Sequence, residues 1–332
     1  MKLNVNRVGR AALSAGLLLC SAVLVSCGGG GTTVNNFVAK RVLAFGDESS
    51  VINLADGSKF TINAVSTTDA SKFDCTGSLL WIQSVAALYG LVFPECPGAV
   101  PAPASRIRAT NGATVADLAA QIAQQDAEGG FAGDDLVTVL VGTHDIVNQF
   151  SAYPRVPEAQ LIGTLKQAGA ALAVHVNGMA ERGAKVLVST APDLGRSPFA
   201  GDRSTGSTNV NPGVLTRLSA AFNDGLLGKL NNDGHKIGLV QLDAYVQSVD
   251  NARIAGSSTF VNTTLGACLA TALPPVCSTA TLGTDAAAVP APTVVSNANA
   301  VTWLWADSLH LSVGGQGGLG SLAITRARNN PF

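Results

Sequence analysis

Short, uninterrupted runs of apolar residues recur along this chain, as is typical of strands buried on both faces of a parallel sheet. Strong runs extend from Val42 to Gly46, from Leu136 to Gly142, from Lys185 to Thr190 and from Ile237 to Leu242, and a weaker one from Arg106 to Ala109. The first two of them end at a glycine. The pattern predicts a sheet of about five strands.

Between these runs, apolar residues recur at the spacing of a helix. The clearest helix is expected from Pro157 to Gly183, with Leu161, Leu165, Ala168, Leu172, Val176 and Met179 on one stripe. Shorter helices are expected at 79–89, 115–125, 215–230 and 313–328. Strands that alternate with helices predict an α/β fold with a doubly wound, mostly parallel sheet and helices on both faces. The active crevice of such a sheet lies at the carboxyl ends of the strands.

The N-terminus carries the features of an export signal. Lys2, Arg7 and Arg10 precede an apolar stretch of about 15 residues, which is too short to span a bilayer comfortably. The stretch ends in Leu-Val-Ser before Cys27, which resembles the bacterial lipobox. We therefore expect a signal peptide at 1–26, a lipidated tether at 27–40 and one α/β domain at 41–332, with an excursion around 250–300. An ordinary secretory signal with an incidental cysteine is the alternative.

Four cysteines remain in the exported part of the chain: Cys75, Cys96, Cys268 and Cys277. An even number in an exported protein favours disulfides, and four cysteines allow three connectivities. The local pairs Cys75–Cys96 and Cys268–Cys277 are expected. Zinc is not expected, because there is no C-x-x-C spacing and no nearby histidine cluster.

Composition narrows the class of protein. Of 332 residues, 47% are hydrophobic and only 13% are charged, which excludes a disordered chain. The net charge of −1 argues against a nucleic-acid partner, which normally meets a basic stripe. No P-loop is present, and Gly315-x-Gly317-x-x-Gly320 does not follow a first strand, so no nucleotide cofactor is expected.

Polar motifs follow the predicted strands. Phe-Gly-Asp-Glu-Ser-Ser comes after the first strand, Thr-Asn-Gly112 after the second, Gly-Thr-His144-Asp after the third, and Asp307-x-x-His310 lies near the C-terminus. In this order and spacing, the chain resembles the SGNH/GDSL hydrolase family of bacterial esterases and lipases. The resemblance extends from about Val42 to the C-terminus. It implies the doubly wound, flavodoxin-like fold and an ester hydrolase activity without a metal or another cofactor.

The resemblance also implies roles for individual residues. Acyl transfer needs a nucleophile, a base, a carboxylate that orients the base, and donors for the oxyanion. Asp307 and His310 match the carboxylate and the base, and their three-residue spacing places them on one side of a turn. Gly112 matches the block that lends a backbone N–H to the oxyanion hole.

Two residues depart from the family pattern. Glu48 stands where the serine should directly follow Asp47, and Ser49 comes one residue later. His144 stands where the family has an asparagine that donates to the oxyanion; an imidazole can also donate. Three interpretations remain open: catalysis by Ser49, catalysis by Glu48 or another variant, and a fold that has lost catalysis.

The function expected is a lipid-anchored ester hydrolase of the cell envelope that acts through a serine acyl-enzyme, with Ser49, His310 and Asp307 as catalytic residues. The alternative is a non-catalytic surface lipoprotein that binds a glycan or lipid. The partners expected are a small ester, a lipid or an acylated glycan, and a membrane through the lipid at Cys27. The chain is expected to be monomeric. Gly28 is not the aspartate that retains lipoproteins at the inner membrane, which favours the outer membrane.

Overall fold

The structure is a computed structural model, which describes residues 37–69, 71–98, 102–201, 211–279, 293–329 and 332. The expected signal peptide, Cys27 and most of the expected tether lie outside the described residues, as does part of the 250–300 excursion. Residues 37–332 form one compact unit. Within the described part of the chain, no helix combines the length and the apolar character that crossing a membrane requires.

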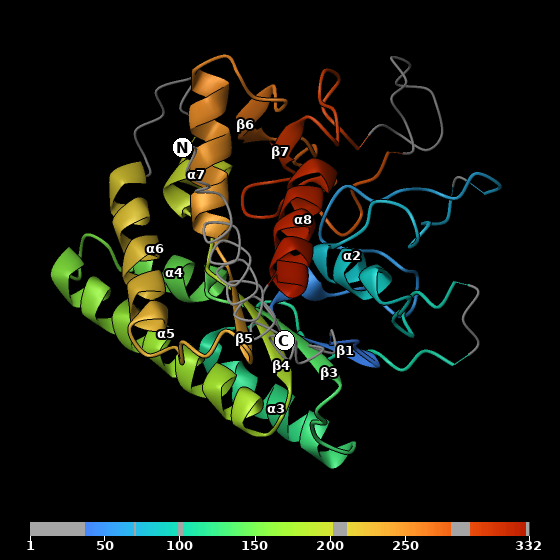
Figure 1. The fold of residues 1–332 in the computed structure, drawn as a ribbon. Coiled ribbons are helices and arrows are strands. Elements are labelled where there is room, and N and C mark those ends of the chain that lie inside the picture. The colour runs from blue at the N-terminus through green and yellow to red at the C-terminus, as the bar shows by residue number, and fades with distance from the viewer. Residues whose placement is uncertain (1–36, 70, 99–101, 202–210, 280–292, 330–331) are drawn as a thin grey trace, which may run out of the picture. The chain divides into compact units, whose positions relative to one another are not determined.

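The centre of this unit is a parallel sheet of five strands (Figure 1). The strands are β1 (Arg41–Gly46), β2 (Arg106–Ile107), β3 (Asp135–Leu140), β4 (Lys185–Ser189) and β5 (Ile237–Val240). Their order across the sheet is β2-β1-β3-β4-β5, and every neighbouring pair is parallel. The expected doubly wound α/β fold is confirmed by this order. The weak run at Arg106 to Ala109 forms only a two-residue strand.

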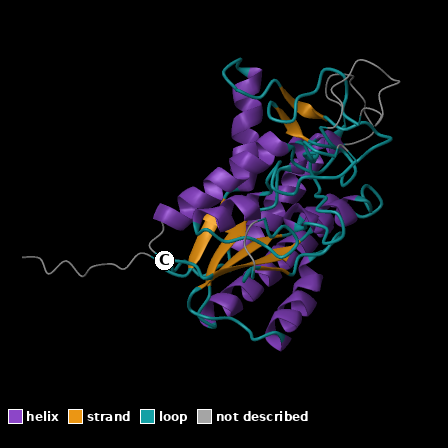
Figure 2. Ribbon diagram, turned by 90° about the vertical axis from the view of Figure 1, so that its right-hand side faces the viewer, coloured by secondary structure: helices purple, strands orange, loops and turns teal. Residues whose placement is uncertain are grey.

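Helices cover both faces of the sheet (Figure 2). They are α2 (Trp81–Leu88), α3 (Leu118–Ala127), α4 (Thr143–Phe150), α5 (Glu158–Glu181), α6 (Pro212–Leu227), α7 (Leu242–Ile254) and α8 (Val313–Asn329). Alternate residues of one strand pack against the helices on opposite faces of the sheet, because successive side chains of a strand point to opposite faces. Leu43 and Phe45 of β1 join the core formed with α3, α5 and α6, whereas Val42 and Ala44 join the core formed with α2 and α8.

The expected helices all exist, with shifted ends. The long apolar stripe forms α5, and the segment expected at 115–125 begins as a short 3-10 turn, Val115–Asp117, before α3. Two helices were not expected: α4 and α7. Helix α4 is only eight residues long, too short for a sustained pattern, and α7 is polar for most of its length, so its buried apolar positions give a weak periodic signal.

The excursion after α7 contains a second, small sheet. Strands β6 (Asn262–Gly266) and β7 (Trp303–Trp305) pair in parallel and enclose a separate small core around Ile62, Cys277 and Trp303. The two disulfides are Cys75–Cys96 and Cys268–Cys277, so the expected pairing is confirmed. The second of them lies within this excursion, between β6 and β7.

Candidate active site at the carboxyl edge of the sheet

The site lies at the carboxyl ends of the parallel strands, at the point where the strand order reverses. The chain order changes between β1 and β3, with β2 on the outer side of β1. In doubly wound sheets the crevice forms at such a point, outside the carboxyl ends of the strands. Glu48 follows β1, Gly112 follows β2 and His144 follows β3, so three separate loops deliver side chains or backbone groups to one place.

The turn after β1 is fixed by a glycine and an aspartate. Gly46 has a φ of 118°, and a Cβ there would lie 1.8 Å from the carbonyl oxygen of Leu140, so only glycine fits. Asp47 is fully buried and caps the 3-10 turn Glu48–Ser50 by accepting a hydrogen bond from the Ser49 N–H at 3.0 Å. Burial, and next the charge of Glu48, raise the pKa of Asp47 to about 7. This turn aims the residue after Asp47 at the crevice.

Glu48 is the central group of the site. Its Oε1 lies 2.6 Å from Nε2 of His144 and 2.8 Å from Nε2 of His310. Its Oε2 accepts a hydrogen bond from the Gly112 N–H at 2.8 Å. The side chain is 5% exposed. A single carboxylate therefore binds both imidazoles and the backbone donor that the sequence assigns to the oxyanion.

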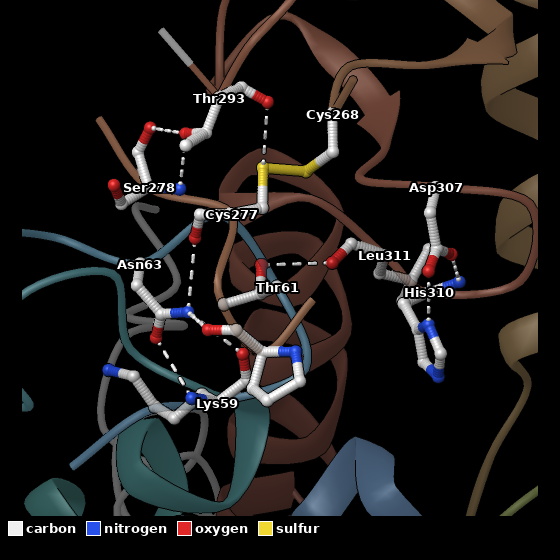
Figure 3. The surroundings of a disulfide bond; sticks show 11 residues. Lys59, Thr61, Asn63, Cys268, Cys277, Ser278, Thr293, Asp307, His310 and Leu311 are labelled. Atoms are coloured by element: carbon white, nitrogen blue, oxygen red, sulfur yellow. Dashed lines mark hydrogen bonds and ion pairs between the residues drawn. A yellow bond between two sulfur atoms is a disulfide. The ribbon is translucent and has the colours of Figure 1, made fainter. Parts of the chain in front are cut away.

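His310 lies between two carboxylates. Its Nδ1 is 2.7 Å from Oδ2 of Asp307, while Oδ1 of Asp307 accepts the backbone N–H groups of Leu309 and His310 (Figure 3). The loop is held next to this pair by Thr61, whose hydroxyl donates to the carbonyl of Leu311 at 3.0 Å. The expected pair Asp307 and His310 is therefore joined by a direct hydrogen bond.

The charge state of His310 follows from its contacts with Asp307 and Glu48. An ionised carboxylate only accepts hydrogen bonds, so His310 must present an N–H at both ring nitrogens, which makes it an imidazolium. Burial lowers the pKa of His310, but the hydrogen bonds and charges of Asp307 and Glu48 outweigh burial and raise it to about 10. Burial likewise raises the pKa of Glu48, and its hydrogen bonds with His144 and His310 hold that pKa far below the usual range.

Ser49 does not occupy the position that was expected of a nucleophile. The group at Nε2 of His310 is the carboxylate of Glu48. Ser49 is half-buried, and its N–H donates to the side chain of Asp47. The expectation that a hydroxyl at residue 49 meets the imidazole is not what the structure shows. The residue was misplaced because one position in a 3-10 turn, with three residues per turn, rotates a side chain by about 120°.

Phe60 is a neighbour of the site that the sequence did not reveal. Its ring centroid lies 5.2 Å from that of His310. It comes from the loop between the Glu48 turn and α2, and it provides an apolar surface beside the imidazole. No motif or periodicity marks this phenylalanine, so nothing in the sequence pointed to it.

The other histidines lie elsewhere. His175 is a half-buried residue of α5, and burial lowers its pKa. His235 is an exposed residue upstream of β5. Within the described ranges, no group of three or more His, Cys, Asp or Glu side chains is arranged to hold a metal ion.

No family model matches the chain, and no curated protein matches it. Solved structures do match. An extracellular lipase from Streptomyces rimosus aligns at 16% identity and a TM-score of 0.42, covering 88% of this chain and all of that one. An acetylxylan esterase from Geobacillus stearothermophilus aligns at 14% identity and a TM-score of 0.41, covering 88% of this chain and 95% of that one.

A lipolytic protein of the G-D-S-L family from Veillonella parvula aligns at 10% identity and a TM-score of 0.40, covering 86% of this chain and 96% of that one. The chain is similar in fold to these lipases and esterases. The doubly wound fold itself is shown by the strand order.

Proposed function

We propose that this protein is a hydrolase of the cell envelope in which Glu48, and not a serine, is the reactive group beside His310. The observation that carries the proposal is the distance of 2.8 Å between Oε1 of Glu48 and Nε2 of His310, with Asp307 on the other side of the ring. A reactive group, an imidazole and an orienting carboxylate then form one chain of contacts, and the imidazole becomes a base once its Nε2 proton has moved away.

Electrostatics support a functional role for this cluster. Burying two carboxylates and an imidazolium costs free energy unless the charges are paired, and groups with strongly shifted pKa values concentrate at functional sites. Here the pKa of His310 is raised to about 10 and that of Glu48 is lowered. The imidazoles also keep some contact with solvent, since the side chains of His144 and His310 are 22% and 14% exposed.

A serine acyl-enzyme through Ser49 receives no support from the geometry. A serine hydrolase needs an unprotonated Nε2 that faces the hydroxyl, and free donors for the oxyanion. In this site Nε2 of His310 donates to Glu48, and the Gly112 N–H and His144 are bound by the same carboxylate. We therefore propose that the natural substrate is not a carboxylic ester cleaved through a serine.

The position in the cell follows from the N-terminal sequence. We propose that Cys27 carries the lipid anchor and that the outer membrane holds it. The lipobox-like segment before Cys27 and the glycine after it support this. Radiolabelled palmitate should enter the full-length chain and should not enter a Cys27→Ser variant; equal labelling of both would exclude the anchor.

The reactive site is tested by exchanging its central residue in the full chain. With p-nitrophenyl acetate, the unaltered protein should show no turnover above background, and Glu48→Ser should raise the rate at least about a hundredfold, because it places a hydroxyl beside a complete base and oxyanion hole. Glu48→Gln is the matched control. It removes the charge without supplying a nucleophile and should stay at background.

Two results would overturn the proposal. One is a Glu48→Ser variant that folds, as judged by circular dichroism, and still fails to hydrolyse the ester. The other is ester turnover by the unaltered chain that disappears in Ser49→Ala, which would restore the serine mechanism.

A binding protein without catalysis is the second candidate, and one observation favours it. Glu48 already occupies the donors that would hold a reacting oxygen, as a bound product carboxylate would. Such a protein would bind a glycan or lipid in the crevice and leave it unchanged. It differs from the first candidate in one respect that can be measured: Glu48 never forms a covalent bond with the ligand.

A further inference from the structure

We propose that Glu48 attacks saturated carbon, and that the substrate class is an epoxide, which the site opens to a diol through an ester of Glu48. This inference rests on the proposed function and adds to it the type of bond that is broken. The inference depends on the contacts of Glu48 with His144, His310 and the Gly112 N–H, and on the order in which these groups can transfer protons.

The chemistry of a carboxylate excludes some electrophiles and favours others. Attack on a carboxylic ester would form an anhydride and expel an alkoxide. Because the anhydride is more reactive than the ester and the alkoxide is a poor leaving group, the intermediate reverts. Attack on saturated carbon forms an ordinary ester, which persists until water is activated against it. Carboxylates serve as covalent nucleophiles in other enzymes by forming such bonds. Glu48 meets the first requirement, because its lowered pKa keeps it ionised.

In the first step, Oε1 of Glu48 forms a bond to one epoxide carbon, and the bond from that carbon to the ring oxygen breaks. The electron pair stays on the oxygen, which takes a proton from Nε2 of His144. His144 is suited to this because its Nε2 lies 2.6 Å from a carboxylate oxygen that only accepts hydrogen bonds, and this contact raises the pKa of the ring. The substrate oxygen replaces Oε1 as the acceptor of that proton.

Esterification removes the charge of Glu48 and so prepares the second step. His310 then faces one carboxylate instead of two, which lowers its pKa, and its Nε2 proton passes to the neutral His144. The freed Nε2 takes a proton from water, and the hydroxide attacks the carbonyl carbon of the Glu48 ester. Asp307 keeps the ring in place through Nδ1.

The oxyanion of this second step has a donor in position. The Gly112 N–H lies 2.8 Å from Oε2, the oxygen that becomes the oxyanion when hydroxide adds. The tetrahedral intermediate collapses by breaking its bond to the alkoxide oxygen, which takes the proton of the new Glu48 carboxyl group and leaves as the diol. The sum is one epoxide plus one water, and every group of the site returns to its starting charge.

The site fits an epoxide better than a glycoside or an alkyl halide. A retaining glycosidase needs a second carboxyl group about 5 Å away as a free acid, but Asp307 is bound to His310 and to two backbone N–H groups. A halide leaves without a proton, so it makes no use of a protonated His144. The apolar ring of Phe60, beside His310, suits a hydrocarbon substituent.

The experiment uses styrene oxide, an aryl epoxide, and the full chain in water enriched in 18-oxygen. In a single turnover, the diol should contain ordinary oxygen, and the tryptic peptide with Glu48 should gain one heavy oxygen, because the atom given to the product comes from the carboxylate. His310→Gln should accumulate an adduct of one epoxide on Glu48, seen by intact mass. Glu48→Gln should form neither diol nor adduct, whereas Glu181→Gln, the same exchange on an exposed glutamate, should behave as the unaltered chain.

Three results would overturn the inference: no diol and no adduct, heavy oxygen in the first-turnover diol without label in Glu48, or adducts that persist in Glu48→Gln. The first would leave the binding function as the use of the crevice. The second would mean that Glu48 activates water directly. Failure here is separate from failure of the proposed function, because the ester hydrolysis gained by Glu48→Ser does not depend on epoxide chemistry.

Discussion

Two polar clusters lie at the same edge of the sheet, and they differ in how their groups are satisfied. The Glu48 cluster follows β1, β2 and β3 and consists of Glu48, Gly112, His144, Asp307 and His310. The Asn223 cluster follows β4 and consists of Thr190, Ala191, Asn223 and Asp243. Both come from strand ends and from segments far away in the sequence.

The polar groups of the Asn223 cluster form hydrogen bonds with one another. The side chain of Asn223 accepts the Ala191 N–H at 2.9 Å and donates to the Ala191 carbonyl at 3.0 Å, so it fastens α6 to the end of β4. It also donates to Asp243, which accepts the hydroxyl of Thr190 at 2.7 Å. Thr190 and Asn223 are only 1% and 2% exposed. Such a network stabilises the fold and offers nothing to a ligand.

The Glu48 cluster instead concentrates ionised groups whose mutual contacts could be exchanged for contacts with a substrate. Its imidazoles retain contact with solvent, and the backbone donor to Glu48 belongs to an exposed loop residue, Gly112. The comparison teaches that a place at the carboxyl edge is not sufficient for a functional site. What distinguishes the Glu48 cluster is the pairing of carboxylates with imidazoles that keep contact with solvent.

The largest effect is expected when His310, the base in a Glu48→Ser variant, is replaced. In a Glu48→Ser background, His310→Gln should return ester hydrolysis to the background rate, a loss of at least about a thousandfold if the gain reaches that size, since the members of such a triad act as a unit. The rate is measured with p-nitrophenyl acetate at saturating concentration. If most of the gain survived, His310 would not be the base and the two clusters would be functionally alike.

The next effect concerns the oxyanion donor. In the same background, His144→Ala should lower kcat about a hundredfold, because one preformed donor to the oxyanion is lost. His144→Asn keeps a donor and should lose much less. Equal losses in the two variants would show that His144 fills space and does not bind the reacting oxygen.

A change in the Asn223 cluster should affect stability and leave chemistry alone. Asn223→Ala leaves the buried N–H and C=O of Ala191 without partners, which costs about 1–3 kcal/mol. Urea unfolding followed by circular dichroism measures this loss. In the Glu48→Ser background, ester turnover per folded molecule should not change; a large fall in turnover would mean that the second cluster also serves the reaction.

The smallest effect is a shift in titration. His310 should titrate at about 10 by NMR, and Glu48→Gln should lower that pKa, since one of the two carboxylates that raise it is removed. The ordinary pKa of histidine is about 6.5, so protonated His310 stabilises the fold fully below that pH. This contribution is lost as the pH rises to about 10. An unchanged titration in Glu48→Gln would show that Glu48 is not its electrostatic partner.

Most of the fold could be predicted from the sequence because long apolar patterns dominate it. The continuous stripe of α5 and the buried runs of β1, β3 and β4 leave few alternatives. Helix α7 was not predictable in the same way. Its buried face includes Asp250, which accepts the hydroxyl of Thr263 at 2.6 Å, so tertiary contacts hold it where hydrophobic periodicity does not.

Most residues of the candidate site could be predicted from the sequence, but its central residue could not. The motifs brought Gly112, Asp307 and His310 to one edge because strand ends converge there. They could not show which of Glu48 and Ser49 turns toward the imidazole. That depends on the positive φ of Gly46 and on the cap by Asp47, which together set the direction of the next side chain.

The first described residue, Phe37, packs its ring edge-on against Tyr89, next to the end of α2, and against Phe332, after α8. It precedes β1, so this aromatic group holds the N-terminal end of the described chain against the two helices that cover one face of the sheet.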